Sequence, residues 1–222
     1  MPVVAFERVG RFGFVNCFLV EEEDGLTVID TMLPGSATKI LAAAGKRPIA
    51  RILLTHAHQD HVSSADALLE ERRDAELIIG RRESRLLKKD MSLDPGEPDD
   101  KLRGGYPGVD AEPARLIEPG DLVGSLEAVA APGHTPGQLA FLDTRDGTLF
   151  CADAYSTLGG VATCAKANPL FPLPAMATWH CPTALETARK LRELDPKRLA
   201  PGHGKVVESP GAAMERAIAK AS

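Results

Sequence analysis

The sequence lacks paired cysteines, long apolar runs and an export signal. Its four cysteines form no CxxC pair and have no regular spacing, so we expect reduced thiols rather than a disulfide framework. No apolar run approaches the roughly 20 residues that a membrane-spanning helix needs. The first residues lack the basic start and apolar core of a signal peptide. We therefore expect a cytoplasmic protein with no membrane partner.

A surplus of basic residues is also missing. The formal net charge is −5, whereas binding to a nucleic-acid backbone needs many Lys and Arg on one face. The basic cluster 81–89 is an exception, and we expect it to be the solvated side of a helix with Leu86 and Leu87 inward. With 222 residues, of which 44% are hydrophobic, the chain is long enough for one domain with a substantial core.

The most informative motif is HxHxDH at residues 56–61, directly after the apolar run 52–54. Side chains alternate along an extended chain, so His56 and His58 project to one side and can hold one ion. If a helix opens at about residue 63, Asp60 and His61 lie near its amino end and can face a second ion. Imidazole nitrogens and carboxylate oxygens suit zinc, manganese or iron.

Four ligands on one loop cannot close two sites, and further candidates follow later strands. His134 lies in GHTPG after the apolar stretch 126–131, Asp153 follows 149–150, and His203 lies in PGHG after 198–200. A rigid sheet presents side chains at one edge in this way. The sixth histidine, His180, has no such pattern, and we interpret it as pocket wall or core.

The hydrophobic pattern predicts an α/β (α+β) fold. Predicted strands are residues 3–8, 14–20, 26–29, 51–55, 76–79, 126–130, 138–142, 148–151 and 198–200. Predicted helices are residues 36–44, 63–69, 182–194 and 211–220. Candidate ligands at strand ends in both halves fit a sandwich of two sheets covered by helices.

Two long segments have no regular pattern. Residues 90–119 hold five prolines and several glycines, and we expect the part at about 91–106 to fold as a lid. Residues 156–180 follow Asp153 and would form a pocket wall. The expected apolar lining, for which a packing-only role is an equal alternative, is Leu158, Leu170, Phe171 and Trp179.

The order of THAHQDH, GHTPGQ, CADA and PGHG, with LTVIDT upstream, resembles the metallo-β-lactamase superfamily over about Phe14 to Val207. The resemblance implies a single-domain, four-layer αββα sandwich spanning residues 1–222, with two metal ions at one edge. It also implies a set of ligands for each site. The first metal would be held by His56, His58 and His134, and the second by Asp60, His61 and His203, with Asp153 between them.

This resemblance implies a metal-dependent hydrolase. Two divalent ions that share an oxygen make hydroxide available near neutral pH and polarise the group it attacks. We expect a bridging hydroxide to attack an ester-like carbon, with the first metal stabilising the oxyanion and the second receiving the leaving atom. Zinc is the first expectation, and manganese and iron stay open because nitrogen and oxygen ligands do not choose among them.

One of these ligands and two further side chains receive additional roles. We expect Asp60 to accept or return a proton, and Tyr155 to donate a hydrogen bond to the oxyanion. Asp30 would orient a ligand histidine through the free nitrogen of its ring.

Branches of the superfamily differ in substrate. Glyoxalase II carries a helical domain that binds glutathione, and only 19 residues follow His203 here. Acyl-homoserine lactonases have a tyrosine three residues beyond the bridging aspartate, where this sequence has Ser156. The expected substrate is therefore a small carboxylic ester, lactone or thioester, with a lactonase-like activity slightly preferred.

Two alternatives stay open. Persulfide dioxygenases share the HxHxDH signature but hold one iron, which here would bind His56, His134 and Asp153. The second alternative is a protein that binds a small ligand without turnover. The sequence does not indicate an oligomeric state.

Overall fold

Two six-stranded sheets face each other in a computed structural model that describes residues 6–222. The first sheet contains, in spatial order, β1 (Phe6–Arg11), β2 (Val15–Glu22), β3 (Gly25–Ile29), β4 (Ile49–Leu54), β5 (Glu76–Gly80) and β6 (Arg115–Ile117). The second contains β14 (Val207–Glu208), β13 (Arg198–Pro201), β10 (Thr148–Ala152), β9 (Leu139–Asp143), β8 (Leu126–Ala130) and β7 (Leu122–Val123).

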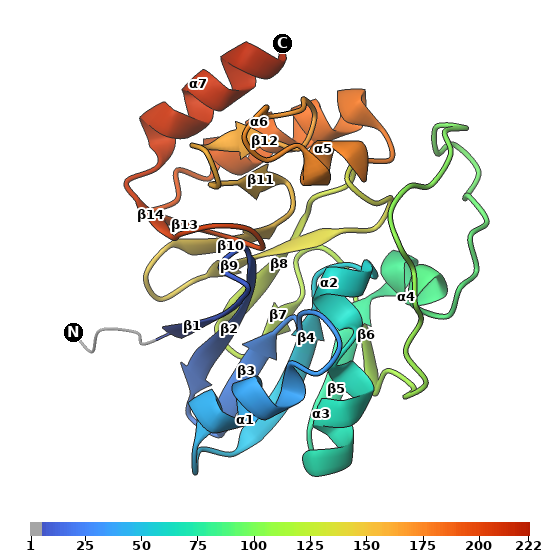
Figure 1. The fold of residues 1–222 in the computed structure, drawn as a ribbon, viewed down its shortest axis with the longest axis vertical. Coiled ribbons are helices and arrows are strands. Elements are labelled where there is room, and N and C mark those ends of the chain that lie inside the picture. Colours follow the sequence, from blue (N-terminus) through green and yellow to red (C-terminus); the bar gives the residue numbers. More distant parts are fainter. Residues whose placement is uncertain (1–5) are drawn as a thin grey trace.

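Helices cover the outer face of each sheet, as Figure 1 shows. The first sheet carries α1 (Ala37–Ala44), α2 (Gln59–Val62), α3 (Ala65–Glu71) and α4 (Arg81–Leu87). On the side of the second sheet are α5 (Leu173–Met176), α6 (Cys181–Glu193), α7 (Gly211–Ala221) and a small hairpin of β11 (Tyr155–Ser156) and β12 (Ala162–Thr163). This arrangement is the expected four-layer αββα sandwich, which is confirmed.

The inner strands of the first sheet contribute to two cores. In β4, Ile52 and Leu54 pack under the helices of the first sheet, while Leu53 between them packs against the second sheet. In β5, Ile79 likewise packs under the helices of the first sheet, and Ile78 packs against the second sheet. Successive side chains in a strand point to opposite faces, so a strand buried on both faces is a continuous apolar run rather than an alternating one. A third core lies between the second sheet and helices α6 and α7.

Strand direction positions the functional loops. The pairs β3–β4 and β4–β5 are parallel, and so is β10–β13 in the second sheet. Strand β8 runs in the direction of β10 because both are antiparallel to β9. The carboxyl ends of β3, β4, β8, β10 and β13 therefore present their following residues at one edge of the sandwich.

The main predicted elements are present, with shifted boundaries. The predicted strand at 3–8 is observed as β1 from Phe6, and Val3 lies outside the described residues. The interpretation of 90–119 as irregular was wrong at its end, because Arg115–Ile117 pairs with β5 as the edge strand β6. The segment 156–180 likewise contains β12 and the single-turn helix α5. These short pieces gain their stability from neighbouring chain segments, which a local pattern does not contain.

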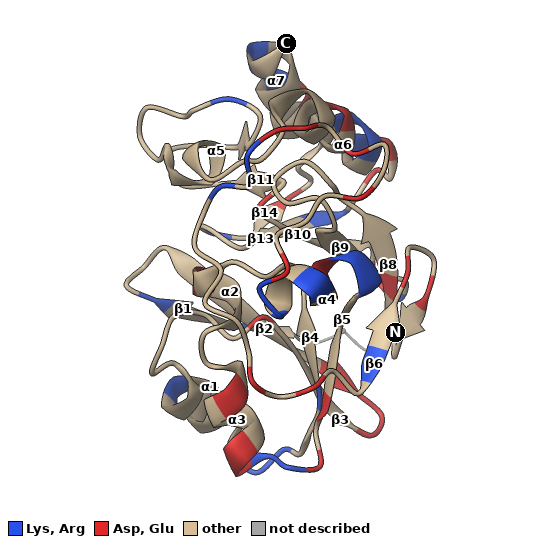
Figure 2. Ribbon diagram, turned by 90° about the vertical axis from the view of Figure 1, so that its right-hand side faces the viewer, with Lys and Arg blue, Asp and Glu red and all other residues tan. Residues whose placement is uncertain are grey.

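The basic cluster was only partly solvated. Leu86 and Leu87 are buried as expected, and Figure 2 shows basic residues gathered on α4. The side chain of Arg82, however, is only 15% exposed and donates hydrogen bonds to both carboxylate oxygens of Glu97. This contact ties α4 to the long segment that follows it.

All four cysteines are free thiols, three of them buried and Cys181 exposed. Within residues 6–222, no helix is both long and apolar enough to cross a bilayer.

Phe150 tests the core between the sheets. Its ring lies in the second sheet, 5.1 Å from the Phe18 ring and 5.3 Å from the Phe6 ring of the first sheet. Replacing Phe150 with Ala should lower the free energy of unfolding by about 3–5 kcal/mol, because a large cavity would remain between the sheets. Urea unfolding measures this, with Leu122→Ala at an exposed edge as the control, for which we expect less than about 0.5 kcal/mol.

Candidate metal centre

Five histidines and two aspartates meet at the edge where the parallel strands end. Three groups have ligand atoms within 4.8 Å of one another: His56, His58 and His134; His56, His61 and Asp153; and Asp60, His61 and His203. The first and third groups are the two ligand sets expected from the sequence. All the candidates are buried except Asp60, whose side chain is 32% exposed.

Asp30, at the end of β3, supports two of the imidazoles. Its carboxylate accepts a hydrogen bond from His61 Nδ1 at 2.7 Å and another from Thr55 Oγ1 at 2.8 Å. Because the Thr55 hydroxyl proton is used there, Thr55 Oγ1 accepts from His56 Nδ1 at 3.0 Å. Asp30 has a φ of 61° although it carries a side chain, a strained conformation typical of functional sites.

The other three imidazoles are held by loop atoms. His58 Nε2 donates to the Arg103 carbonyl at 2.8 Å, and His203 Nδ1 donates to the Phe14 carbonyl at 2.8 Å. His134 Nδ1 lies 3.1 Å from Thr178 Oγ1, whose own proton has two carbonyl acceptors within 3.0 Å. His134 is therefore the donor in this contact.

Each of the five imidazoles thus donates through one nitrogen, which leaves the other nitrogen as an acceptor directed into the cluster. Three of the cluster atoms, His56 Nε2, His61 Nε2 and Asp153 Oδ1, are buried without a hydrogen-bond partner. Leaving buried polar atoms unpaired is costly unless another group satisfies them. Convergent imidazole lone pairs with acceptors on the opposite nitrogens are the arrangement that metal-binding histidines show. The residues fit divalent metal ions.

Asp153 lies between the two expected metal positions. Its Oδ2 is 3.4 Å from His134 Nε2 and 3.1 Å from His203 Nε2, while Oδ1 is 3.3 Å from His61 Nε2. The preceding residue, Ala152, has a φ of 48° and lies at a register shift of β10. This local distortion turns the Asp153 carboxylate into the cluster.

The half of the cluster around the first group is electrically neutral. Burial lowers the pKa of His134 to about 3. Burial and the neighbouring imidazoles also hold the pKa of His56 well below its usual value. Neutral imidazole is the form that binds a metal ion.

The other half is rich in carboxylates. Burial disfavours the charged form of His203, but Asp153 and Asp60 raise its pKa to about 10. Burial is likewise outweighed at His61, whose pKa Asp153 and Asp30 raise. In return, His203 and His61 lower the pKa of Asp153 against the effect of its own burial. The carboxylates here stabilise positive charge, whether it is carried by protons or by a metal ion.

Glu83 is a residue of the candidate site that the sequence pattern did not reveal. It is fully buried in the first turn of α4, where Oε2 accepts from Ala57 N at 2.9 Å. Its Oε1 accepts from Thr135 Oγ1 at 2.5 Å and Gly137 N at 2.9 Å. Burial raises the pKa of Glu83, although these hydrogen bonds favour its charged form. One side chain therefore fixes the HxHxDH loop against the GHTPG loop.

Several of the candidate ligands line a cleft of about 270 Å³. Its lining consists of Phe14, His58, Asp60, Gly104, His134, Asp153, Leu173, Pro174, Met176, Ala177 and His203. Gly104, from the segment expected to form a lid, has a φ of 86°, and a Cβ there would lie 2.4 Å from His58 Nε2. Only glycine allows the backbone to approach the ligand this closely.

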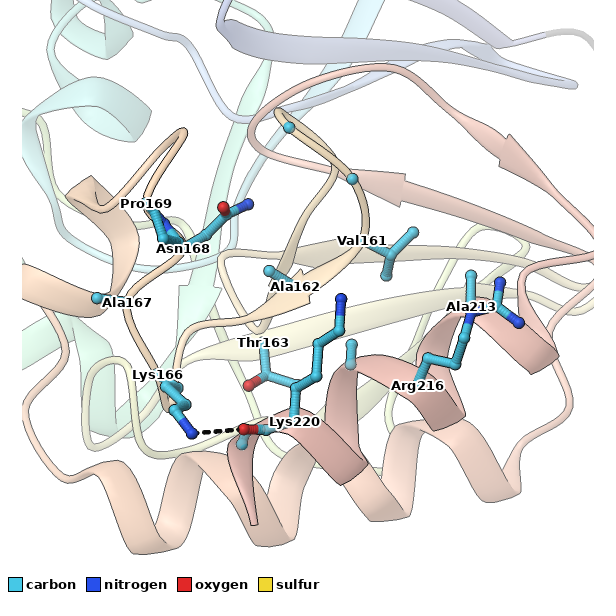
Figure 3. A pocket seen from close by; sticks show the side chains of 14 residues that line it. Val161, Ala162, Thr163, Lys166, Ala167, Asn168, Pro169, Ala213, Arg216 and Lys220 are labelled. Atoms are coloured by element: carbon cyan, nitrogen blue, oxygen red, sulfur yellow. Dashed lines mark hydrogen bonds between the residues drawn. The ribbon is translucent and has the colours of Figure 1, made fainter.

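A larger cavity of about 560 Å³ lies between the 159–169 segment and α7 (Figure 3). Its only charged lining residues are Lys166, Arg216 and Lys220, and no His, Cys, Asp or Glu lines it. Its lining therefore offers none of the side chains that usually ligate metal ions, in contrast to the smaller cleft.

Tyr155 does not reach the cleft, and the interpretation of this residue as an oxyanion donor was wrong. It is fully buried in the core under α6, and its hydroxyl donates to the Ala188 carbonyl at 2.7 Å. The chain turns at residues 151–154, where Ala154 N donates to the Cys151 carbonyl. This turn breaks the two-residue alternation that would have placed Tyr155 on the same side as Asp153.

The pocket wall is also built differently from the expectation. Leu158, Leu170, Phe171 and Trp179 are absent from the cleft lining, and residues of α5 are present instead. Trp179 is buried, and its Nε1 donates to the Asp100 carbonyl at 2.9 Å. His180 lies outside the cluster, where its ring accepts a hydrogen bond from Thr183 N and caps α6.

The chain is similar to a known protein family, to curated relatives and to solved structures. The family model of the metallo-beta-lactamase superfamily matches residues 10–203. The uncharacterized protein YobT of Bacillus subtilis is 45% identical over 100% of this chain and 99% of its own length. Hydroxyacylglutathione hydrolase GloC of Haemophilus influenzae is 30% identical over 69% of each chain. A crystal structure of TTHA1623 in a di-iron-bound form superposes with a TM-score of 0.65, at 24% identity over 96% of each chain.

Glu83→Gln tests the link between the two ligand loops. The amide nitrogen of Gln would face a backbone N–H that now donates to the carboxylate, so the loops should separate. We expect metal affinity to fall by about 10- to 100-fold, measured by competition with a chromophoric chelator. Glu112→Gln, at a side chain that is 85% exposed, is the matched control. Unchanged metal affinity in a folded Glu83→Gln protein would contradict the assignment.

Tyr155→Phe tests the corrected position of this side chain. The variant loses one buried hydrogen bond, so the free energy of unfolding should fall by about 1 kcal/mol. Because the ring is remote from the cleft, turnover of any substrate should be unaltered at a temperature where both proteins are folded. A selective loss of kcat with unchanged stability would restore the catalytic role.

Proposed function

The chain belongs to the metallo-β-lactamase superfamily, and we propose on this basis that it is a binuclear metal-dependent hydrolase of an ester-type bond in a small molecule. The single observation that carries the proposal is the convergence of five oriented imidazoles and two carboxylates at one cleft. Membership of the family and relatives named as hydrolases support hydrolysis in general. The bond type and the number of metal ions are our inference.

The ligand assignment follows from the groups of converging atoms. The first ion would be held by His56, His58 and His134, and the second by Asp60, His61 and His203. The Asp153 carboxylate lies within 3.4 Å of imidazole nitrogens from both sets and would be shared. Zinc, manganese and iron all accept these nitrogen and oxygen donors, and zinc is our first expectation.

The lining of the cleft favours water as the nucleophile. None of the described residues that line it carries a hydroxyl, thiol or amine group. Two bound divalent ions would supply an ionised water and polarise a carbonyl group. The residues of the chain would then position the substrate and move the proton.

Asp60 is the best-placed group for proton transfer. It is the most exposed of the candidate ligands, and its Oδ2 lies 3.2 Å from His203 Nε2. Burial would raise its pKa, but His61 and His203 lower it, so Asp60 is ionised at neutral pH. An ionised carboxylate at the mouth of the cleft can accept the proton that hydrolysis releases and pass it to solvent.

An ester-type substrate agrees with the charges of the cleft. Phosphoryl groups are usually held by Arg or Lys, and neither lines this cleft. A carboxylic ester, lactone or thioester needs only a polarised carbonyl. The relative named hydroxyacylglutathione hydrolase supports an acyl substrate at the family level.

The test begins with metal content. We expect two divalent ions per chain by elemental mass spectrometry of protein purified without added metal. The protein should hydrolyse members of a panel of lactones, carboxylic esters and thioesters, and a chelator should abolish this activity. Asp153→Asn should lose metal and reduce kcat/KM by at least about 100-fold, because a shared ligand loses its charge.

His180→Ala is the matched control, because His180 is the one histidine outside the cluster. It should retain two ions and full activity. A single iron per chain with no hydrolysis of the panel would contradict the binuclear hydrolase and favour an oxidoreductase.

A further inference from the structure

Exposed apolar side chains gather at the mouth of the metal cleft. Phe12 is 70% exposed, Met176 63% and Leu173 54%, and two further strongly exposed large apolar residues, Leu170 and Leu122, do not line the cleft. Leu173 and Met176 line the cleft itself, together with Phe14. We define the apolar rim as Phe12, Phe14, Phe171, Leu173 and Met176.

Ring contacts connect one side of this rim to a candidate ligand. The Phe12 ring stacks on the Phe14 ring with centroids 6.3 Å apart, and Phe14 lies 6.4 Å from Phe171. The Phe171 ring is 5.2 Å from the His203 ring. Two segments far apart in the sequence, the β1–β2 turn and the segment before α5, therefore form one apolar surface that reaches the cluster.

The turn that carries Phe12 is strained. Phe12 has a φ of 53°, which a bulky residue adopts at a cost, and it also leaves its ring in water. The Arg11 guanidinium lies over this ring, 5.0 Å from its centroid, and donates to Ser36 Oγ. A strained and exposed aromatic side chain beside a reactive site points to a contact with a ligand.

Charge narrows the chemistry of that ligand. No Lys or Arg lines the cleft, and the Arg11 guanidinium, which lies over the Phe12 ring, donates a hydrogen bond to Ser36 Oγ. An anionic group placed inside the cleft, against Phe14, Leu173 and Met176, would lose water without gaining a Lys or Arg partner, which is unfavourable. An uncharged alkyl or aryl group would instead cover the exposed rings and the Leu173 and Met176 side chains.

We propose that the apolar rim binds an uncharged, apolar arm of the substrate, so that the preferred substrates are esters, lactones or thioesters of medium-length alkyl chains. This inference rests on the proposed function and deepens it. A cleft of this kind differs from one that binds a charged group attached to the acyl group of its substrate.

Chain-length kinetics test the proposal. For p-nitrophenyl acetate, butyrate, hexanoate and octanoate, kcat/KM should rise about three- to fourfold for each of the first few added methylenes. An ester of equal length that ends in a carboxylate should react at least about tenfold more slowly than its uncharged counterpart. No dependence on length, or equal rates for the charged ester, would overturn the proposal.

Variants locate the effect on the rim. In the double variant Leu173→Ser, Met176→Ser, the ratio of kcat/KM for octanoate to that for acetate should fall by about tenfold or more. The ratio does not depend on the fraction of folded or metal-loaded enzyme. Leu122→Ser, which removes an equally exposed apolar side chain at β7, should leave the ratio unchanged. An unchanged ratio in the double variant would overturn the proposal.

A binding experiment separates this inference from the proposed function. Straight-chain methyl ketones have the carbonyl group but no leaving group, so calorimetry measures their binding without turnover. Affinity that rises from 2-butanone to 2-nonanone supports the rim even if no ester is hydrolysed. Ester hydrolysis with ketone binding that is independent of length supports the hydrolase and overturns the rim. A rim variant that changes only the molecular mass in sedimentation would identify an interface between copies instead.

Discussion

The structure depends on a requirement of the imidazole ring. A buried neutral imidazole has one donor and one acceptor nitrogen, and a metal ligand must keep its acceptor free. Each of the five histidines in the cluster therefore needs a hydrogen-bond acceptor on its far side. The acceptors come from five different segments of the chain: Asp30, Thr55, the Phe14 and Arg103 carbonyls, and Thr178. The fold is arranged so that all five reach the same edge.

The same requirement couples the two long segments to the candidate metal centre. The 90–119 segment provides both the Arg103 carbonyl for His58 and the Gly104 wall of the cleft. The 156–180 segment provides Thr178 for His134 and the exposed side chains of α5. Trp179 joins the two segments through the Asp100 carbonyl. Residues that line the cleft are thus attached to residues that orient the candidate ligands, so substitutions in the cleft lining should also affect the geometry of the candidate metal centre.

Much of the fold and the cluster could be predicted from the sequence because the relevant signals are local. Apolar runs identify β4 and β5, and the HxHxDH motif is contiguous. Glu83 was missed, although its spacing to Leu86 and Leu87 places it on the buried face of α4. Tyr155 was misassigned because a left-handed residue at 152 changes which side the following side chains face. The residues next to Glu83 do not reveal its hydrogen-bond partners, and the residues next to position 152 do not reveal its left-handed conformation.

The sequence by itself determined the types of candidate ligand, their order and their positions after strands, because these depend on residue identity and on local periodicity. It also determined the resemblance to the superfamily, since the motifs are short and specific. Only the tertiary structure decided which nitrogen of each imidazole faces the cluster, which buried carboxylate connects the ligand loops and which side chains form the mouth of the cleft. These properties depend on contacts between segments that lie tens to almost two hundred residues apart, such as Phe14 with His203. Their geometry arises only when both sheets are packed.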